Sequence, residues 1–416
     1  MISFWRIFLL ELISLMRSHT IILLTAASVA WMFIFPNVMH DDFTDAGARE
    51  LYIHFSLGGV FFILIISLLA SATASIAKER DEKRLQLTLV RPVSRCAIAL
   101  GKIYAHVFVG AVILAIASGI LLFNVSISQP CNHVLSPILP SPKEEAKIMY
   151  ERFMADTNTP VEVRKANKAS VLRLLENKAY DHYEAIPTNR LAKWRFAMPE
   201  RLSDGERLAV QLRLTNAMDL RMSIYGHFSI GDYSGAVSNL TQAVLRIPLV
   251  GEGKVLGNEL SFLNKGSSSV MLRPRRDIKL LVSADGFGWN LFRAYFQLLS
   301  ILTLVVAIGV LLSSALSRPV AMFVAMVMLL ISEISPSIIE QYSDELDAPT
   351  LDRIGLEITR VSAMVTSPIS SLSPLEALAK DECVESSQTL RIVVLDFALM
   401  PFLLALLSAF IMAKKQ

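Results

Sequence analysis

Two apolar runs, residues 51–77 and 103–123, constrain the fold of this chain more than any other feature of its sequence. Neither run contains Asp, Glu, Lys or Arg, and each could cross a bilayer, since a spanning helix needs about 20 mostly apolar residues. The chain has 416 residues, of which 53% are hydrophobic, and its mean hydropathy is +0.49. This is too apolar for an ordinary soluble protein of its size. We therefore expect a polytopic α-helical membrane protein.

Further apolar runs bring the expected number of spans to six. The expected spans lie at residues 21–35, 51–77, 103–123, 294–316, 320–331 and 392–413. The run at 320–331 is short for a span and is followed directly by Ser332 and Glu333. Loop charges support the six-span topology better than hydropathy does.

The charges of the short loops orient these spans. Residues 36–50 carry Asp41, Asp42, Asp45 and Glu50 against a single Arg49, whereas residues 78–102 carry seven Lys and Arg side chains. Because Lys and Arg of short loops stay on the cytoplasmic side, we expect residues 78–102 and both termini in the cytoplasm. Arg318, Lys414 and Lys415 fall on that same side. The expected location is the cell (inner) membrane, as a multi-pass protein.

The first 20 residues do not read as a secretory signal, because Glu11 interrupts the apolar stretch and no small-residue cleavage pattern follows. On a helical wheel Ser3, Arg6, Ser14 and Arg17 share one face, opposite mostly apolar residues. This pattern predicts a helix lying in the inner interface, with Trp5 at headgroup depth. The alternative is a simple extension of the first span.

Residues 124–288 are long enough to form an extracytoplasmic domain of their own. Residues 141–144 and 159–162 each combine a hydroxyl cap, a proline and a glutamate at the third helical position, which marks helix starts. Helices are expected over about 142–155 and 160–183. From residue 207 the apolar period becomes two, which predicts strands near 207–214, 222–230, 243–250, 259–263, 269–272 and 278–282. The domain is therefore expected to be α+β, a helical hairpin followed by a small β-sandwich.

The remaining parts of the chain are residues 1–123, with the first three spans, and residues 289–416, with the last three. Residues 333–390 form a second extracytoplasmic segment that is too long for a plain connector. Apolar residues recur at helical spacing over 351–364, and Ser-Pro-Leu-Glu at 373–376 marks a capped helix start. These helices either lie on or dip into the outer leaflet, or form a cap packed on the span ends.

Five ionisable residues lie in or near the expected spans: Lys102, His106, Arg293, Glu333 and Asp396. Such groups are costly inside a membrane and often functional. All five lie near span ends, where snorkelling or pairing at the interface is the alternative to a transport role.

The three cysteines divide between the two sides of the membrane. Cys96 lies in the cytoplasmic segment, where thiols stay reduced. Cys131 and Cys383 both face the oxidising side in this topology. We hypothesise a disulfide that joins them and tethers the outer domain to the last span. The alternative is two unpaired thiols far apart.

The sequence contains none of the motifs that mark common catalytic sites. It has no G-x-x-x-x-G-K-[ST] phosphate loop, no H-E-x-x-H, no G-x-S-x-G and no C-x-x-C. The basic residues of the outer domain are interleaved with acidic ones, which argues against a nucleic-acid surface. We expect no enzymatic activity, no cofactor, no metal and no nucleic-acid partner for this chain.

The segment at 78–102 is more elaborate than a connection between two helices requires. Its charges at 78–84 favour a helix that continues from the second span into water, and Leu85, Leu87, Leu89 and Val90 give that helix an apolar patch. Pro92 stops the helix, and Ser94 can cap the third span. A soluble partner could cover the apolar patch; the alternative is an ordinary charged loop held by lipid headgroups.

A specific pattern surrounds this segment. Leu-Val-Arg-Pro-Val-Ser-Arg at 89–95 is followed by Ala-Leu-Gly-Lys at 99–102, and a second turn reads Ser-Ser-Ala-Leu-Ser-Arg-Pro-Val-Ala at 313–321. With the N-terminal amphipathic helix and the spans, residues 1–123 and 289–416 resemble the type-2 ATP-binding-cassette exporter permeases. The domain at 124–288 departs from that family, whose simpler members have only a short loop there.

The resemblance implies that the 78–102 segment docks into a groove on a separate ATPase subunit and passes its movement to the spans. The expected ATPase-docking residues are Glu79, Arg80, Glu82, Leu85, Leu87, Leu89, Arg91 and Arg95. It also implies that two permease chains pair in the lipid bilayer, as a homodimer or a heterodimer. The predicted function is the permease subunit of an ATP-driven exporter, moving a substrate or a mechanical signal outward. The alternative is a non-transporting membrane scaffold or sensor, whose outer sandwich binds a ligand or an envelope partner.

Overall fold

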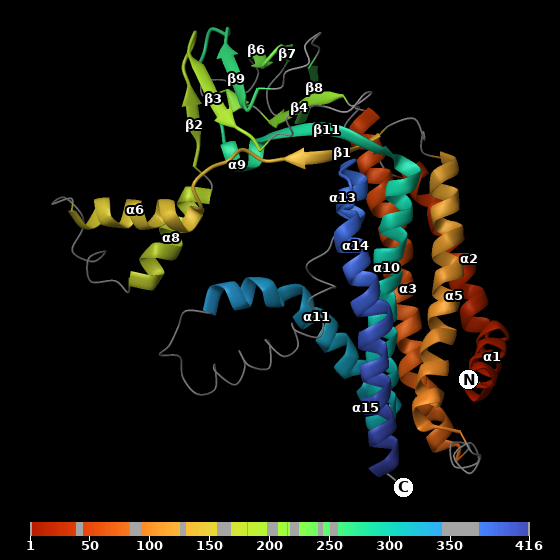
Figure 1. The fold of residues 1–416 in the computed structure, drawn as a ribbon. Coiled ribbons are helices and arrows are strands. Elements are labelled where there is room, and N and C mark those ends of the chain that lie inside the picture. The colour runs from red at the N-terminus through yellow and green to blue at the C-terminus, as the bar shows by residue number, and fades with distance from the viewer. Residues whose placement is uncertain are drawn as a thin grey trace. The chain divides into compact units, whose positions relative to one another are not determined.

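The chain forms two compact units in the computed structural model, shown in Figure 1. The helical unit consists of Met1–Cys131 and Gly286–Gln416, and the β unit consists of Asn132–Asp285. The structure describes residues 2–38, 45–83, 93–124, 130–155, 168–180, 182–197, 207–213, 215–216, 224–239, 244–249, 257–342 and 374–414.

The helical unit is built around one central helix. Its long helices are α3 (Asp45–Asp81), α5 (Arg95–Asn124) and α10 (Phe287–Ala315). Helix α10 contacts α3 and α5 as well as α15 (Met400–Lys414) near the C-terminus, and most of its side chains are buried. These apolar helices satisfy their backbone polar groups internally, as a membrane interior requires.

Among the described residues, four helical stretches are long and apolar enough to cross a membrane. They are Ala48–Asp81, Arg95–Asn124, Phe287–Ala315 and Ser386–Lys414, and the bent pair Phe4–Met16 and Ile21–Ile34 raises the number to five if it counts as one span. Helix α11 (Arg318–Tyr342) contains a shorter apolar stretch, Arg318–Ile331. The chain is thus a multi-pass membrane protein, and the count of six spans stays a prediction.

The N-terminal segment forms two helices rather than one. Helix α1 (Ile2–Met16) and helix α2 (His19–Val38) meet at a bend of 65°, so α1 is not a straight extension of the first span. Helix α1 packs on α5, where a β-carbon on Gly101 would lie only 2.8 Å from Ile7 Cγ2. The glycine therefore permits the close approach of the two helices.

Gly110 permits a second close approach, between α5, α3 and α10. A β-carbon at this position would overlap Leu302 Cδ2 and lie 2.8 Å from Leu68 Cδ1, both on fully buried side chains. We expect Gly110→Val to lower the free energy of unfolding by about 1–3 kcal/mol through overpacking, measured by thermal unfolding in detergent. Gly119→Val is the control on the same helix, because no atom lies within 4 Å of its β-carbon. An equal loss in both variants would contradict this explanation.

The C-terminal span begins earlier than expected and is not a regular α-helix. It runs through α14 (Ser386–Ile392), a π-helical segment η1 (Val393–Leu399) and α15. Residues 386–391 are mainly polar, which explains why hydropathy placed the start at 392. Helix α13 (Pro374–Ala379) begins where the Ser-Pro-Leu-Glu pattern predicted a helix. The helical pattern at 351–364 lies outside the described residues.

The two helices predicted for the start of the outer domain are both present in the β unit. Helix α6 (Pro142–Ala155) has the predicted bounds, and its capping box is complete: the N–H of Glu144 donates to Ser141 Oγ, and the N–H of Ser141 donates to Glu144 Oε2. Helix α8 (Lys168–Tyr180) packs against α6 through Ala146, Val171 and Leu175. The predicted start of this second helix, at 160–167, lies outside the described residues.

Among the described residues, the β unit also contains a short helix, α9 (Pro274–Asp277), and eleven strands in three sheets. The sheet orders are β1-β11-β4-β8, β2-β10-β5 and β3-β9-β6-β7, and the registered pairs are antiparallel. Buried residues from all three sheets make one hydrophobic core, with the Phe228 and Phe262 rings stacked 4.4 Å apart. The strands are β1 (Pro130–Leu135), β2 (Glu184–Ile186), β3 (Leu191–Arg195), β4 (Leu208–Arg213), β5 (Thr215–Asn216), β6 (Ile224–Ile230), β7 (Tyr233–Asn239), β8 (Val244–Leu249), β9 (Glu259–Asn264), β10 (Val270–Leu272) and β11 (Ile278–Gly286).

Six of these strands coincide with runs predicted from the period of two: β4, β6, β8, β9, β10 and β11. Strand β7 was missed because its small and polar residues carry no apolar alternation. It forms because a tight turn at Gly231, which has a φ of 56°, folds it back on β6. An antiparallel β-rich unit is therefore present, and its extracytoplasmic placement stays a prediction.

Candidate functional site

A buried ionic cluster joins three helices of the helical unit. The ammonium of Lys102, near the start of α5, lies 2.9 Å from Glu11 Oε2 on α1 and 2.8 Å from Glu79 Oε1 on α3. The side chain of Lys102 is 3% exposed, whereas those of Glu11 and Glu79 are 16% and 30% exposed. We call these residues the Lys102 cluster. Each partner alone would be costly to bury, so the pairing explains why all three charges are tolerated there.

A second set of polar contacts extends the Lys102 cluster toward the centre of the bundle. His106 is fully buried one helical turn after Lys102, and its Nδ1–H donates to the Lys102 carbonyl at 2.8 Å. Its Nε2 lies 3.1 Å from the hydroxyl of Ser71 on α3. The donor at Nδ1 follows from chemistry, because a carbonyl oxygen only accepts. Polar contacts thus hold α3 and α5 together over two turns.

The end of α3 is also fixed to the end of α10. Arg80 Nη2 donates to the Leu316 carbonyl at 2.8 Å and Nη1 to the Ser314 carbonyl at 3.4 Å. Ser313 Oγ accepts from the N–H groups of Ile76 and Ala77. Carbonyls at a helix C-terminus lack partners within the helix, so Arg80 supplies what the last turn of α10 needs.

These contacts surround both ends of the 78–102 segment. Glu79 and Arg80 lie at its start and Lys102 closes it, so α1, α3, α5 and α10 converge on its two attachment points. Any force on the segment therefore acts on four helices. Leu85, Leu87, Leu89 and Arg91 lie outside the described residues, and the docking surface stays a prediction.

The described docking candidates differ in how far they face solvent. Glu79 and Arg80 make the contacts described above with neighbouring helices, while Glu82 is exposed and lies 4.0 Å from the Lys78 ammonium. Arg95 is half-buried at the start of α5. The sequence analysis did not pair Lys102 with Glu11 and Glu79. The signal that could have done so is one lysine and two glutamates, each beside an apolar run.

Asp396 is a second buried ionisable residue of the helical unit. It is 3% exposed, lies in the π-helical segment, and has no polar partner among the described residues. The Tyr104 hydroxyl on α5 donates to the carbonyl of the next residue, Phe397, at 2.9 Å. Segments of π-helix are frequent at functional sites, so Asp396 belongs among the candidates. The side chain of Glu333 lies outside the described part of the chain.

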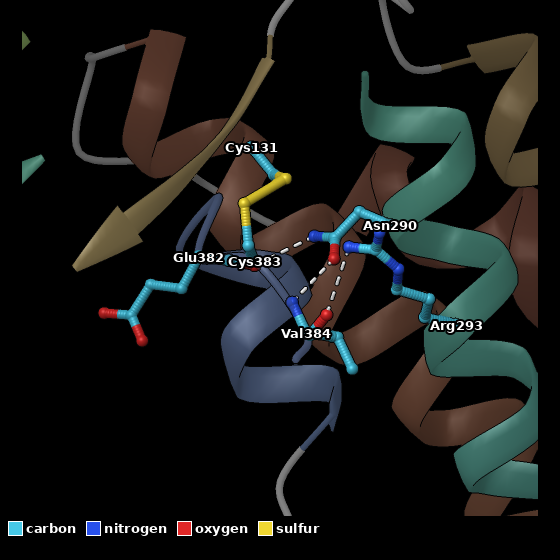
Figure 2. Close-up of a disulfide and its surroundings, with 6 residues drawn as sticks. All are labelled: Cys131, Asn290, Arg293, Glu382, Cys383 and Val384. Carbon is cyan, nitrogen blue, oxygen red and sulfur yellow. Dashed lines mark hydrogen bonds between the residues drawn. A yellow bond between two sulfur atoms is a disulfide. The ribbon is translucent and has the colours of Figure 1, made fainter. Parts of the chain in front are cut away.

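The opposite end of the helical unit is held by a disulfide. Cys131 and Cys383 are bonded, with their Cα atoms 5.1 Å apart, as Figure 2 shows. Asn290 on α10 holds the neighbouring backbone in two directions: its Nδ2 donates to the Glu382 carbonyl at 2.8 Å, and its Oδ1 accepts from the Val384 N–H at 2.7 Å. Arg293 Nη1 donates to the Val384 carbonyl at 3.3 Å. The segment before the C-terminal span is thus fixed to α10.

An ion pair adds to this end of the unit. Arg49 Nη2 on α3 lies 2.9 Å from Asp381 Oδ1, and its guanidinium lies 5.1 Å from the Phe287 ring centroid. Within the described residues no group of three or more His, Cys, Asp or Glu is arranged to hold a metal ion. Polar contacts thus fix neighbouring helices to one another at both ends of the unit.

The comparison with protein families agrees with the sequence resemblance. Residues 7–139 match a family model described as an ABC-2 family transporter protein, which confirms that resemblance and supports a membrane permease of ABC transporters. The matched residues include most of α1, the whole of α3, the 78–102 segment and the whole Lys102 cluster. No curated protein and no solved structure matches the chain.

Proposed function

We propose that this chain is the permease subunit of an ATP-driven exporter, and that ATP is hydrolysed by a separate subunit docked on residues 78–102. The family match over residues 7–139 and the span-capable helices support this proposal. The lack of a phosphate loop in the sequence is consistent with ATP hydrolysis on another chain. In this proposal six spans place both termini and residues 78–102 in the cytoplasm, and the β unit outside it.

The Lys102 cluster is the observation that carries the coupling mechanism. Separating Lys102 from its two carboxylates would leave the buried ammonium unpaired, a cost of about 3–5 kcal/mol. That cost is several times the thermal energy, so the N-terminal helix, the end of α3 and the start of α5 move as one body. Docking of an ATPase at the segment between Glu79 and Lys102 then shifts the helices together, as in rigid-body transitions of other switches.

Two such chains would pair, each coupled to an ATPase, and rocking of the paired units would move a substrate or a mechanical signal outward. The paired state and the direction of movement are parts of the proposal. A scaffold or sensor without transport is the rival, and it predicts no ATPase partner at all.

The test is co-purification of an ATPase with the tagged chain from its native membranes. We expect an ATP-binding-cassette ATPase in the purified material, and at least about a tenfold loss of it after Leu85→Asp, Leu87→Asp and Leu89→Asp, since charges would replace the apolar side chains that the ATPase covers in this proposal. The control replaces Leu174 and Leu191, exposed leucines of the β unit, with Asp. Absence of an ATPase, or equal recovery with both variants, would contradict the proposal.

A further inference from the structure

A groove of about 470 Å³ lies in the helical unit between the start of α3 and helix α13. Helix α3 contributes Glu50, Leu51, His54 and Phe55, and the α13 side contributes Glu376, Ala379 and Lys380. Figure 1 shows α13 beside the end of the bundle that includes the start of α3. The two helices are in contact, and a β-carbon on Gly58 would lie 3.7 Å from Leu375 Cδ1.

The position of the groove along α3 sets its depth in a membrane. The span-capable part of α3 begins at Ala48, so Glu50 and His54 lie in its first two turns. Residues at that position of a span meet the headgroup region rather than the hydrocarbon core. The groove therefore opens where phospholipid headgroups are concentrated.

The polar lining of the groove contains acidic and basic side chains, and some of their polar atoms are available to a ligand. Lys380 forms an ion pair with Glu376, and this hydrogen bond raises the pKa of Lys380, with Glu382 and Glu50 adding to the effect and burial opposing it. Among the described residues no hydrogen-bond donor reaches the carboxylate of Glu50. The His54 ring has only an edge contact with the Phe55 ring there, 5.3 Å between centroids.

The apolar lining continues along the same helix face. Leu51, Phe55 and Phe62 are spaced by four and seven residues, which places them on one stripe of α3. Phe55 is 40% exposed and Phe62 is 63% exposed. The stripe leads from the polar groove toward the middle of the span, as an acyl chain would run below its headgroup.

We propose that this groove binds a phospholipid whose headgroup carries both a primary ammonium and a phosphate. The ammonium lies against Glu50, the phosphate against Lys380 and His54, and one acyl chain along Phe55 and Phe62. Two carboxylates against one lysine disfavour an anionic headgroup that lacks a cation, because like charges repel in this partly desolvated site. This proposal does not depend on ATPase docking, since the groove and the Lys102 cluster lie at opposite ends of α3.

The test measures lipids retained by the full-length protein purified in detergent, by native mass spectrometry after addition of one defined lipid. The lipids are palmitoyl-oleoyl phosphatidylethanolamine, phosphatidylcholine and phosphatidylglycerol, with soluble phosphoethanolamine as competitor. We expect phosphatidylethanolamine to be retained about tenfold better than the other two, the difference that one charge-assisted hydrogen bond provides. Glu50→Gln should remove that preference, and Glu385→Gln, at an exposed carboxylate outside the groove, should keep it.

Each other outcome overturns the proposal. Equal retention of phosphatidylcholine shows that the primary ammonium is not recognised, and better retention of phosphatidylglycerol shows an anion site. Complete displacement by soluble phosphoethanolamine at equal concentration shows that the acyl chain contributes nothing. An unchanged preference in Glu50→Gln, with thermal unfolding of the lipid-free variant confirming its fold, shows that the lipid binds elsewhere.

Discussion

Replacing Lys102 with Met is expected to lower the free energy of unfolding by about 3 kcal/mol, because it leaves two carboxylates without their cation; this is the lower end of the cost for a buried charge, since both carboxylates are partly exposed. Lys102 is 3% exposed on its side chain and lies within 2.9 Å of Glu11 and 2.8 Å of Glu79. The measurement is thermal or denaturant unfolding of the purified protein in detergent. An unchanged free energy of unfolding in Lys102→Met would show that the cluster does not hold the three helices together.

The matched control is Lys78→Met, on the same helix end as Glu79. Lys78 is 66% exposed and lies 4.0 Å from Glu82, and an exposed pair of this kind contributes about 0–1 kcal/mol. A second variant combines Lys102→Met with Glu11→Gln and Glu79→Gln. Most of the stability should return in that variant, because no buried charge is left unpaired. Simple addition of the three single effects would contradict the cluster interpretation.

Loss of the disulfide is expected to have the second large effect. The bond between Cys131 and Cys383 joins residues 252 positions apart, and removing a native disulfide typically costs about 2–5 kcal/mol. Cys383→Ser and reduction of the unmodified protein should lower the unfolding temperature equally. Reduction should then have no further effect on Cys383→Ser. The contacts of Asn290 with the Glu382 carbonyl and the Val384 N–H remain available, so the loss should stay partial.

Cys96→Ser is the control for this variant, because Cys96 is the free cysteine of the chain. It should leave the unfolding temperature and its response to reduction unchanged. Peptide mapping without reductant should recover the Cys131 and Cys383 peptides as one linked species. Recovery of either cysteine as a free thiol in the folded protein would contradict the prediction.

Local signals in the sequence identified much of the fold. The apolar runs predicted α3, α5 and α10 because a helix in a membrane needs only length and hydropathy. The Ser141 to Glu144 capping pattern predicted the start of α6, because such a cap depends on neighbouring residues alone. Strands with alternating apolar residues were predicted for the same reason. Strand β7 was not, because its place depends on the turn at Gly231 and on its partner strand.

The candidate site required contacts between distant positions. Lys102 is 91 residues from Glu11 and 23 from Glu79, and no local pattern indicates which of the nearby charges it meets. The π-helical segment around Asp396 depends on how the C-terminal span packs on its neighbours. One such contact is the hydrogen bond that the Tyr104 hydroxyl donates to the Phe397 carbonyl. The cysteine pair is a long-range contact that the sequence does predict, because membrane sidedness leaves two of the three cysteines on one side.

The most direct test of the central claim is site-specific photocross-linking from the 78–102 segment. A photoreactive benzoyl-phenylalanine replaces Leu87 in the tagged chain in its native membranes, and the control carries it at Phe410, which is 56% exposed on α15. The account predicts a cross-link from position 87 to an ATP-binding-cassette ATPase and none from position 410. Failure of position 87 to cross-link to any ATPase, with the protein folded and inserted, would contradict it.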